Sequence, residues 1–236
     1  DSRKSLLGSI EQQQRFLDRY ATVNSLNRYR TGALSLLTSG KVRRAFDIEN
    51  ADPRARDRYG RNLFGHSLIV GRRMIEAGAR FTTVIWDMTD GADSGWDSHD
   101  GLTTSLRDHL LPGLDRGFSA LLDDLRERGL LDDTLVVFAT EFGRMPMFQV
   151  GTYGRDHNPH GFTTWLAGAG VKGGTSYGAT DEFGFKAREN ILTPHDFHAT
   201  ILHLLGLDHK KLTYYHNGIQ RRLTDVHGHV IGELIA

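Results

Sequence analysis

The chain has 236 residues, of which 39% are apolar and 25% charged, a composition that suits one sizeable α/β domain or two small ones. Lysine plus arginine (29) balances aspartate plus glutamate (29), so no basic surface argues for nucleic acid, and no apolar run approaches the ~18 residues of a membrane span. Cysteine is absent, which excludes disulfides, thiolate metal sites and cysteine nucleophiles, whereas the twelve histidines are a mild pointer to metal chemistry.

The first third of the chain predicts helices. Apolar residues near helical spacing indicate an amphipathic helix within 2–30, and a second, short helix is expected at 40–46. A third helix is expected at 62–77, with Gly78 in the C-cap position. Residues 49–60 are charged and interrupted by proline and glycine, so we expect them to form a surface connection.

The middle of the chain predicts alternating strands and helices. The run 81–87 is rich in β-branched and aromatic residues, which is typical of a strand. Leucines at three- and four-residue steps predict a helix over 102–128, bent or restarted at Pro112, where proline removes a backbone donor. Continuous apolar runs at 134–140 and 162–167 predict two further strands.

The last third predicts one clear helix, at 194–205, with Thr193 as its N-cap and Gly206 as its end. The tail from 208 is polar and interrupted by glycines, so irregular structure is expected, with a short strand near Val230.

Unalternated apolar strands separated by helices are typical of a sheet that is covered on both faces. We therefore predict a single α/β domain over 1–236, with a mainly parallel central sheet and helices on both faces. Its helical and linker region is expected at 1–60, its core at 61–207 and an irregular tail at 208–236.

The sequence contains no complete nucleotide-binding or serine-hydrolase motif. The glycines at 168–173 match the dinucleotide fingerprint and follow an expected strand, but the glycine-rich 174–178 cannot open the helix that a pyrophosphate needs. No Gly-x-Ser-x-Gly elbow and no Walker loop occurs in the sequence.

Three loops carry the residue types of a metal centre. They are 95–100, 141–146 and 154–160, and we expect them to converge because ligands that share an ion must meet. Their candidate ligands are Asp97, His99, Glu141, Asp156, His157 and His160. In the competing interpretation, Glu141 and Arg144 pair with one another on the surface. The histidines of the last helix, His195, His198 and His203, are expected to be structural or exposed rather than ligands, as are the exposed His216, His227 and His229.

The order of these motifs resembles the alkaline phosphatase and sulfatase superfamily. The segments Gly95-Trp-Asp-Ser-His, Thr140-Glu-Phe-Gly-Arg-Met-Pro146, Gly154-Arg-Asp-His and Phe197-His-Ala-Thr-Ile-Leu-His-Leu-Leu-Gly206 are most similar to its sulfatase-like branch known as domain-of-unknown-function family 1501. The resemblance covers roughly residues 60 to 236. It implies an alkaline-phosphatase-like sandwich and a periplasmic or otherwise extracytoplasmic location.

The resemblance also implies a ligand set and a substrate class. Asp97, His99 and His157 match the positions that hold one divalent metal, with zinc the first expectation and calcium, magnesium or manganese as alternatives. The second metal of the superfamily takes an Asp-His pair where this chain has Glu141 and Phe142, so that metal would need Asp156 or His160. Arg144 or Arg155 is expected to pair with the non-bridging oxygens of an anionic phosphate or sulfate ester.

The resemblance places a nucleophile on the first strand of the sheet, and no counterpart is found in 1–236. We therefore expect the nucleophile upstream of residue 1, and an upstream segment, a partner subunit or the 2–30 helix to cover the open sheet edge. The competing hypothesis is a metal-poor binding or structural protein that keeps the fold and has lost turnover.

Overall fold

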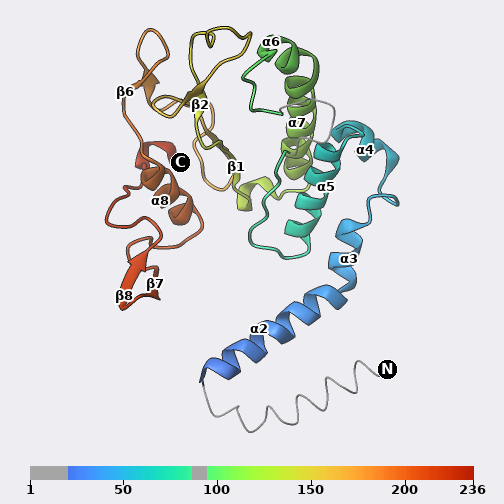
Figure 1. Cartoon of the computed structure of the whole chain (residues 1–236). Helices are drawn as coiled ribbons and strands as arrows, with labels where there is room; N and C mark the ends of the chain where they lie inside the picture. The colour runs from blue at the N-terminus through green and yellow to red at the C-terminus, as the bar shows by residue number, and fades with distance from the viewer. Residues whose placement is uncertain (1–20, 87–94) are drawn as a thin grey trace.

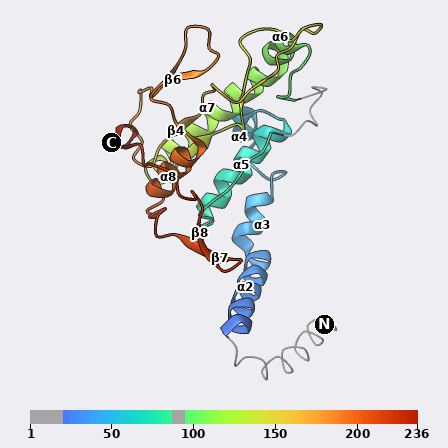
Figure 2. The same cartoon turned by 60° about the vertical axis from the view of Figure 1, so that its left-hand side comes forward.

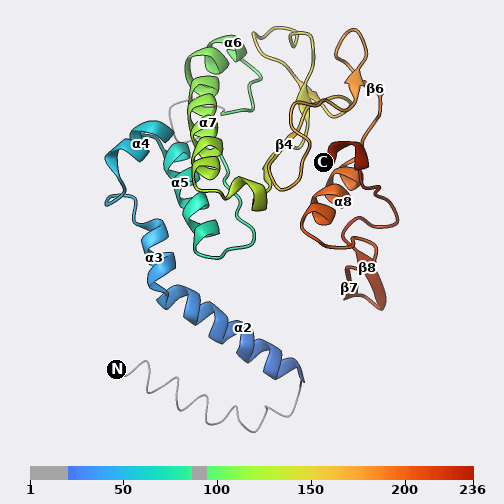
Figure 3. The ribbon, with the colours of Figure 1, turned by 180° about the vertical axis from the view of Figure 1, so that it is seen from behind.

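The computed structural model describes residues 21–86 and 95–236. Within these residues four helices come first: α2 (Ala21–Thr38), α3 (Gly40–Phe46), α4 (Pro53–Tyr59) and α5 (Leu63–Glu76). Figures 1 and 3 show α2 projecting away from the helices that follow. The predicted helix at 40–46 is confirmed, and so is the one at 62–77, whose N-cap Asn62 accepts a hydrogen bond from the Gly65 amide. Most of the predicted 2–30 helix lies outside the described residues; its last part belongs to α2.

The expected surface connection at 49–60 is wrong in part, because α4 forms there. Asp52 caps the helix by accepting from the Arg54 amide, and Pro53 occupies the first helical position, where its missing N–H costs nothing. The charged composition therefore conceals a short amphipathic helix whose last residue, Tyr59, is buried.

The helical core forms where α4 and α5 pack against α7 (Leu111–Glu127). Figure 2 shows α5 and α7 side by side. The buried apolar side chains of this helical core come from all three helices: Tyr59, Leu68, Ile69 and Ala120. At the edge of this core the Tyr59 hydroxyl donates to Asp124 at 2.9 Å, and Arg72 and Arg128 both pair with the same carboxylate at 2.6 Å. The buried aspartate is thus fully compensated.

The predicted interruption of the long helix is confirmed. A short α6 (Leu102–Ser105) leads into a π-helical turn, Leu106–Leu110, and α7 then begins with Pro112 in its first turn. The Leu111 amide donates to the Leu106 carbonyl, five residues back, so the ladder widens just before the proline that has no donor.

The strands do not form the predicted mainly parallel central sheet, and that fold prediction is wrong. The described residues contain four small antiparallel pairs, each of two strands. They are β1 (Val136–Phe138) with β4 (Trp165–Ala167), β2 (Gly143–Arg144) with β3 (His157–Asn158), β5 (Ala179–Thr180) with β6 (Ala187–Glu189), and β7 (Thr213–His216) with β8 (Ile219–Arg222).

The connection between the two apolar strands explains their direction. Parallel neighbours need a crossover of a dozen or more residues, usually a helix, but 139–164 contains the β2–β3 pair and no helix. The chain therefore returns antiparallel from β1 to β4. Their apolar side chains pack on α7, where the Phe118 ring lies 4.3 Å from the ring of Trp165. The predicted burial on both faces is also wrong, because of these two strands only Val136 is buried and Val137 is exposed.

The predicted strand at 81–87 is also wrong over its described part. Residues 81–86 adopt no regular structure, and Phe81 and Ile85 are 76% and 77% exposed. β-propensity describes how a side chain fits a pleated surface, and a strand forms only where a backbone partner is present.

The C-terminal part contains α8 (Pro194–Leu204), which confirms the predicted helix. Thr193 and Asp196 cap it reciprocally, and Gly206 follows with φ 76°. The β7–β8 hairpin was not expected; its turn is Asn217-Gly218, both with positive φ, which is a strong hairpin signal. Near Val230 the expected strand is replaced by a 3₁₀ turn at Gly232–Leu234.

In the part of the chain that the structure describes, no helix is both long enough and apolar enough to cross a membrane.

Candidate metal centre

Three side chains from two distant loops bring their ligand atoms together. His99 Nε2 lies 3.0 Å from His157 Nε2, and Asp97 Oδ1 lies 3.1 Å from the first and 3.0 Å from the second. This is the only group of three or more acidic or histidine side chains within 21–86 and 95–236 whose ligand atoms could share one ion. The predicted convergence of 95–100 with 154–160 is confirmed.

The two loops are joined through their backbones. The Arg155 amide donates to the Ser98 carbonyl at 3.2 Å, and the Leu102 amide donates to the Tyr153 carbonyl at 3.2 Å. Between these bonds, a Cβ on Gly154 would lie 2.0 Å from the carbonyl carbon of His99. Only glycine permits so close an approach of two backbones.

The β2–β3 ladder sets the position of the third loop. Arg144 is paired with His157 in the register, which brings the 141–146 segment against the ligand cluster. The Arg144 guanidinium donates to Asp97 Oδ1 at 2.5 Å and to the Trp96 and Arg155 carbonyls, each at 3.0 Å. One side chain thus binds the backbone on both sides of the cluster as well as one of its ligands.

This arrangement keeps Asp97 ionised. The Arg144 guanidinium first, and the His157 imidazole second, lower the pKa of Asp97 to about 2. An ionised carboxylate is the form that binds a metal, so the ligand is ready at neutral pH.

Two further residues hold the imidazoles in place. Gln149 Oε1 lies 3.0 Å from His99 Nδ1 and can accept a hydrogen bond from an Nδ1–H, which leaves the Nε2 lone pair directed at the cluster. The Phe142 ring stacks on His157, with ring centroids 4.0 Å apart and planes at 27°. No motif pointed to Gln149, whereas Phe142 occupies a position where the resemblance implies histidine.

The other predicted ligands lie outside the cluster. Asp156 is exposed, and its carboxylate lies 3.9 Å from His99 Nδ1. That nitrogen is on the side of the imidazole that faces away from the cluster. Glu141 and His160 are exposed as well. The Arg155 guanidinium lies over the Phe148 ring, 5.6 Å from its centroid.

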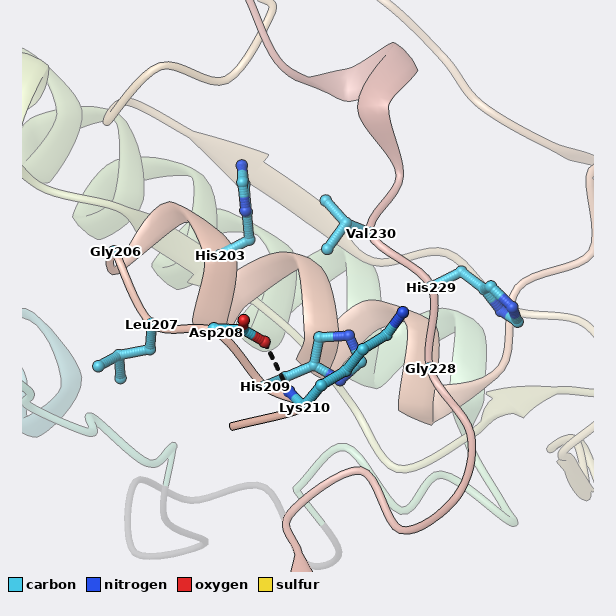
Figure 4. A pocket seen from close by; sticks show the side chains of 9 residues that line it. All are labelled: His203, Gly206, Leu207, Asp208, His209, Lys210, Gly228, His229 and Val230. Atoms are coloured by element: carbon cyan, nitrogen blue, oxygen red, sulfur yellow. Dashed lines mark hydrogen bonds between the residues drawn. The ribbon is translucent and has the colours of Figure 1, made fainter. Parts of the chain in front are cut away.

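A separate cavity of about 610 Å³ lies at the C-terminal end of α8 and contains none of the predicted site residues. Figure 4 shows its histidines pointing in different directions, and the side chain of His229 is 91% exposed. His229 Nδ1 is within hydrogen-bond distance of Asp196 Oδ1, at 3.2 Å. The ring centroids of His195 and His227, which do not line the cavity, lie 5.1 Å apart. The cavity is lined by His203, Gly206, Leu207, Asp208, His209, Lys210, Gly228, His229 and Val230.

Comparison with known proteins places the chain in a family. A family model described as a protein of unknown function, DUF1501, matches residues 1–235. No curated protein and no solved structure matches the chain. Because the match spans nearly the whole sequence, the chain belongs to the DUF1501 family.

Proposed function

We propose that Asp97, His99 and His157 bind one divalent metal ion, zinc in the first place, and that the protein uses it to hydrolyse an anionic phosphate or sulfate ester. The observation that supports this most strongly is the meeting of two imidazole nitrogens and a carboxylate oxygen within 3.1 Å of one another. The resemblance of the motifs to the alkaline phosphatase and sulfatase superfamily supplies the reaction class.

The donor set suits zinc. Catalytic zinc sites use three protein ligands of the His and Asp/Glu type at about 2.0 to 2.2 Å, which in a tetrahedral arrangement lie about 3.3 Å apart. The three donors here are 3.0 to 3.1 Å apart and would need to separate only slightly. Calcium and magnesium prefer sets of oxygen ligands, so two imidazoles weigh against them.

A bound divalent ion supplies Lewis-acid polarisation of a phosphoryl or sulfuryl oxygen and lowers the pKa of a water or hydroxyl nucleophile. Two further side chains pre-organise the ligands for that ion. Arg144 keeps Asp97 charged, and Gln149 fixes the tautomer of His99. Because the Arg144 guanidinium already binds one ligand and two carbonyls, we assign it a positioning role and give the contact with ester oxygens to Arg155.

A second metal is not part of this proposal. Phe142 has no ligand atom and is engaged with His157, while Glu141, Asp156 and His160 are exposed and outside the cluster. The same observation favours a second function, a binding protein that holds at most one metal ion and performs no turnover, because one half of a two-metal site is replaced by a phenyl ring.

Zinc titration of the purified protein tests the ligand assignment. We expect one zinc per chain and its loss in His157→Ala, because removing one of three ligands leaves an incomplete coordination shell. His160→Ala is the matched control, since it removes a neighbouring histidine outside the cluster. Full zinc occupancy in His157→Ala, or its loss in His160→Ala, would show that the ligands are wrongly assigned.

Hydrolysis separates the two functions. Zinc-dependent cleavage of a phosphate or sulfate ester, absent in His157→Ala, supports the enzyme. Stoichiometric zinc without cleavage of either ester, measured on the full chain, supports the binding protein.

A further inference from the structure

The 147–153 loop exposes an unusual amount of apolar surface beside the candidate metal centre. Of its seven residues, four are large and apolar, and they are exposed to between 55% and 98%: Met147, Phe148, Val150 and Tyr153. Isolated exposed apolar side chains are common, but a group of them on one loop marks a binding surface.

Hydrogen bonds anchor the loop at several points. The Gln149 amide donates to the Gly154 carbonyl at 2.9 Å, and the Thr152 amide donates to the Gln149 carbonyl at 3.2 Å. The Tyr153 amide donates to Asp100 Oδ1 at 3.1 Å. In Figure 1 the loop lies at the top of the molecule beside α6, to which the Leu102–Tyr153 hydrogen bond joins it. A fixed apolar surface binds without the entropic cost of ordering a flexible loop.

Side chains of the loop contact one ligand of the metal centre and one cation. Gln149, in its middle, bonds to His99, and Phe148, the preceding residue, lies against the Arg155 guanidinium. Within the described part of the chain, Arg155 has no carboxylate partner, and its buried Nε has no hydrogen-bond acceptor. A buried donor without a partner costs free energy until an acceptor reaches it.

We infer that the ligand of this site is an anionic ester whose alcohol part is apolar: the anionic group pairs with the metal centre and Arg155, and the alkyl or aryl part lies on Phe148 and Val150. This inference rests on the proposed function and narrows its substrate class. An unpaired cation and an apolar surface in contact with one another are complementary to an amphiphilic anion.

Calorimetric titration of the zinc-loaded full chain tests the inference with three probes: inorganic phosphate, glycerol phosphate, and octyl phosphate below its micelle concentration. We expect octyl phosphate to bind at least about tenfold more tightly than glycerol phosphate, because several methylene groups leave water. In the double variant Phe148→Ser/Val150→Ser this preference is expected to vanish, so that octyl phosphate and glycerol phosphate bind with similar affinity. Leu223→Ser/Val226→Ser, which removes two exposed apolar side chains outside the loop, is the matched control and keeps the preference.

The outcomes separate the two hypotheses. If phosphate binds and octyl phosphate has no advantage, or if the advantage survives in the loop variant, the loop assignment is refuted and the metal centre stands. If the octyl preference persists in His157→Ala, the assignment of the anionic group to the metal centre is refuted, and the assignment of the apolar part to the 147–153 loop is kept. Binding of none of the three probes refutes both. Loop-dependent binding to phosphatidylcholine vesicles without any octyl preference would assign the loop to a lipid surface and overturn the inference.

Discussion

Gly154→Ala is expected to take the metal centre apart without touching a ligand. An added Cβ would lie 2.0 Å from the His99 carbonyl carbon, 2.1 Å from its oxygen and 2.4 Å from the Asp100 nitrogen. Nonbonded carbons are best separated by about 3.5 Å, so the two backbones must part by about 1.5 Å. All three obstacles are backbone atoms, and no side chain can turn aside to relieve the clash.

The magnitude follows from the spacing of the ligands. His99 belongs to one of the separated backbones and His157 to the other, and their nitrogens are 3.0 Å apart. A misplacement of about 1 Å typically costs about 100-fold where geometry decides function, and we expect a loss of this order in zinc affinity. Overpacking should also lower the free energy of unfolding by about 1 to 3 kcal/mol.

Zinc titration and hydrogen exchange measure the two consequences separately. The Arg155 and Leu102 amides, which bridge the loops, should exchange faster in the variant whether or not metal is present. Gly173→Ala is the control, because a Cβ there meets nothing within 4 Å. Unchanged zinc affinity together with unchanged protection of both amides would refute the close-approach argument.

Three further changes have expected outcomes. Burial alone raises the pKa of Asp196, but hydrogen bonds from Thr193 and His229 outweigh it and lower the pKa to about 2. The ionised carboxylate therefore stabilises the folded state by about 2 kcal/mol above pH ~4, and this contribution is lost as the pH falls toward 2. Denaturation curves of Asp196→Asn should lack this pH dependence. Tyr59→Phe removes a buried hydrogen bond to Asp124 and should lower the free energy of unfolding, measured in urea, by about 2 kcal/mol. Tyr215→Phe, at an exposed position, should change it by almost nothing; an equal loss in both variants would argue against the Tyr59–Asp124 hydrogen bond as a source of stability. Gln149→Leu should weaken zinc binding at least about tenfold through the tautomer of His99, and an unchanged affinity would remove Gln149 from the site.

The sequence predicted helices well where caps were visible. Gly78, Thr193 and Gly206 mark helix ends by local hydrogen bonding or by a positive φ, and both are properties of the residue itself. α4 was missed because its charged residues resemble a loop, although Asp52-Pro53 is a start signal.

The sheet could not be predicted in the same way, because strand direction is not encoded in the strand. The 134–140 and 162–167 runs have the composition of buried strands, and their antiparallel pairing depends on the absence of a crossover helix between them. The run at 81–87 has the same composition and pairs with nothing over its described residues, so composition does not reveal whether a partner exists.

The candidate site shows the same division. Asp97, His99 and His157 were singled out by residue type and motif order, and their convergence is confirmed. Arg144 was expected to contact substrate, whereas its hydrogen bonds to Trp96 and Arg155 carbonyls depend on the β2–β3 register. Gln149 carries no motif, and only the fold of its loop brings it to His99.

The stacking of Phe142 on His157 also provides a spectroscopic label. Protons above the face of an aromatic ring experience its ring current, so the carbon-bound protons of the His157 imidazole should resonate upfield of the ordinary histidine range. Among twelve histidines, that displaced signal would identify the ligand. Its position would report on the assembly of the centre in solution, at any stage of metal loading, through a side chain that binds no metal.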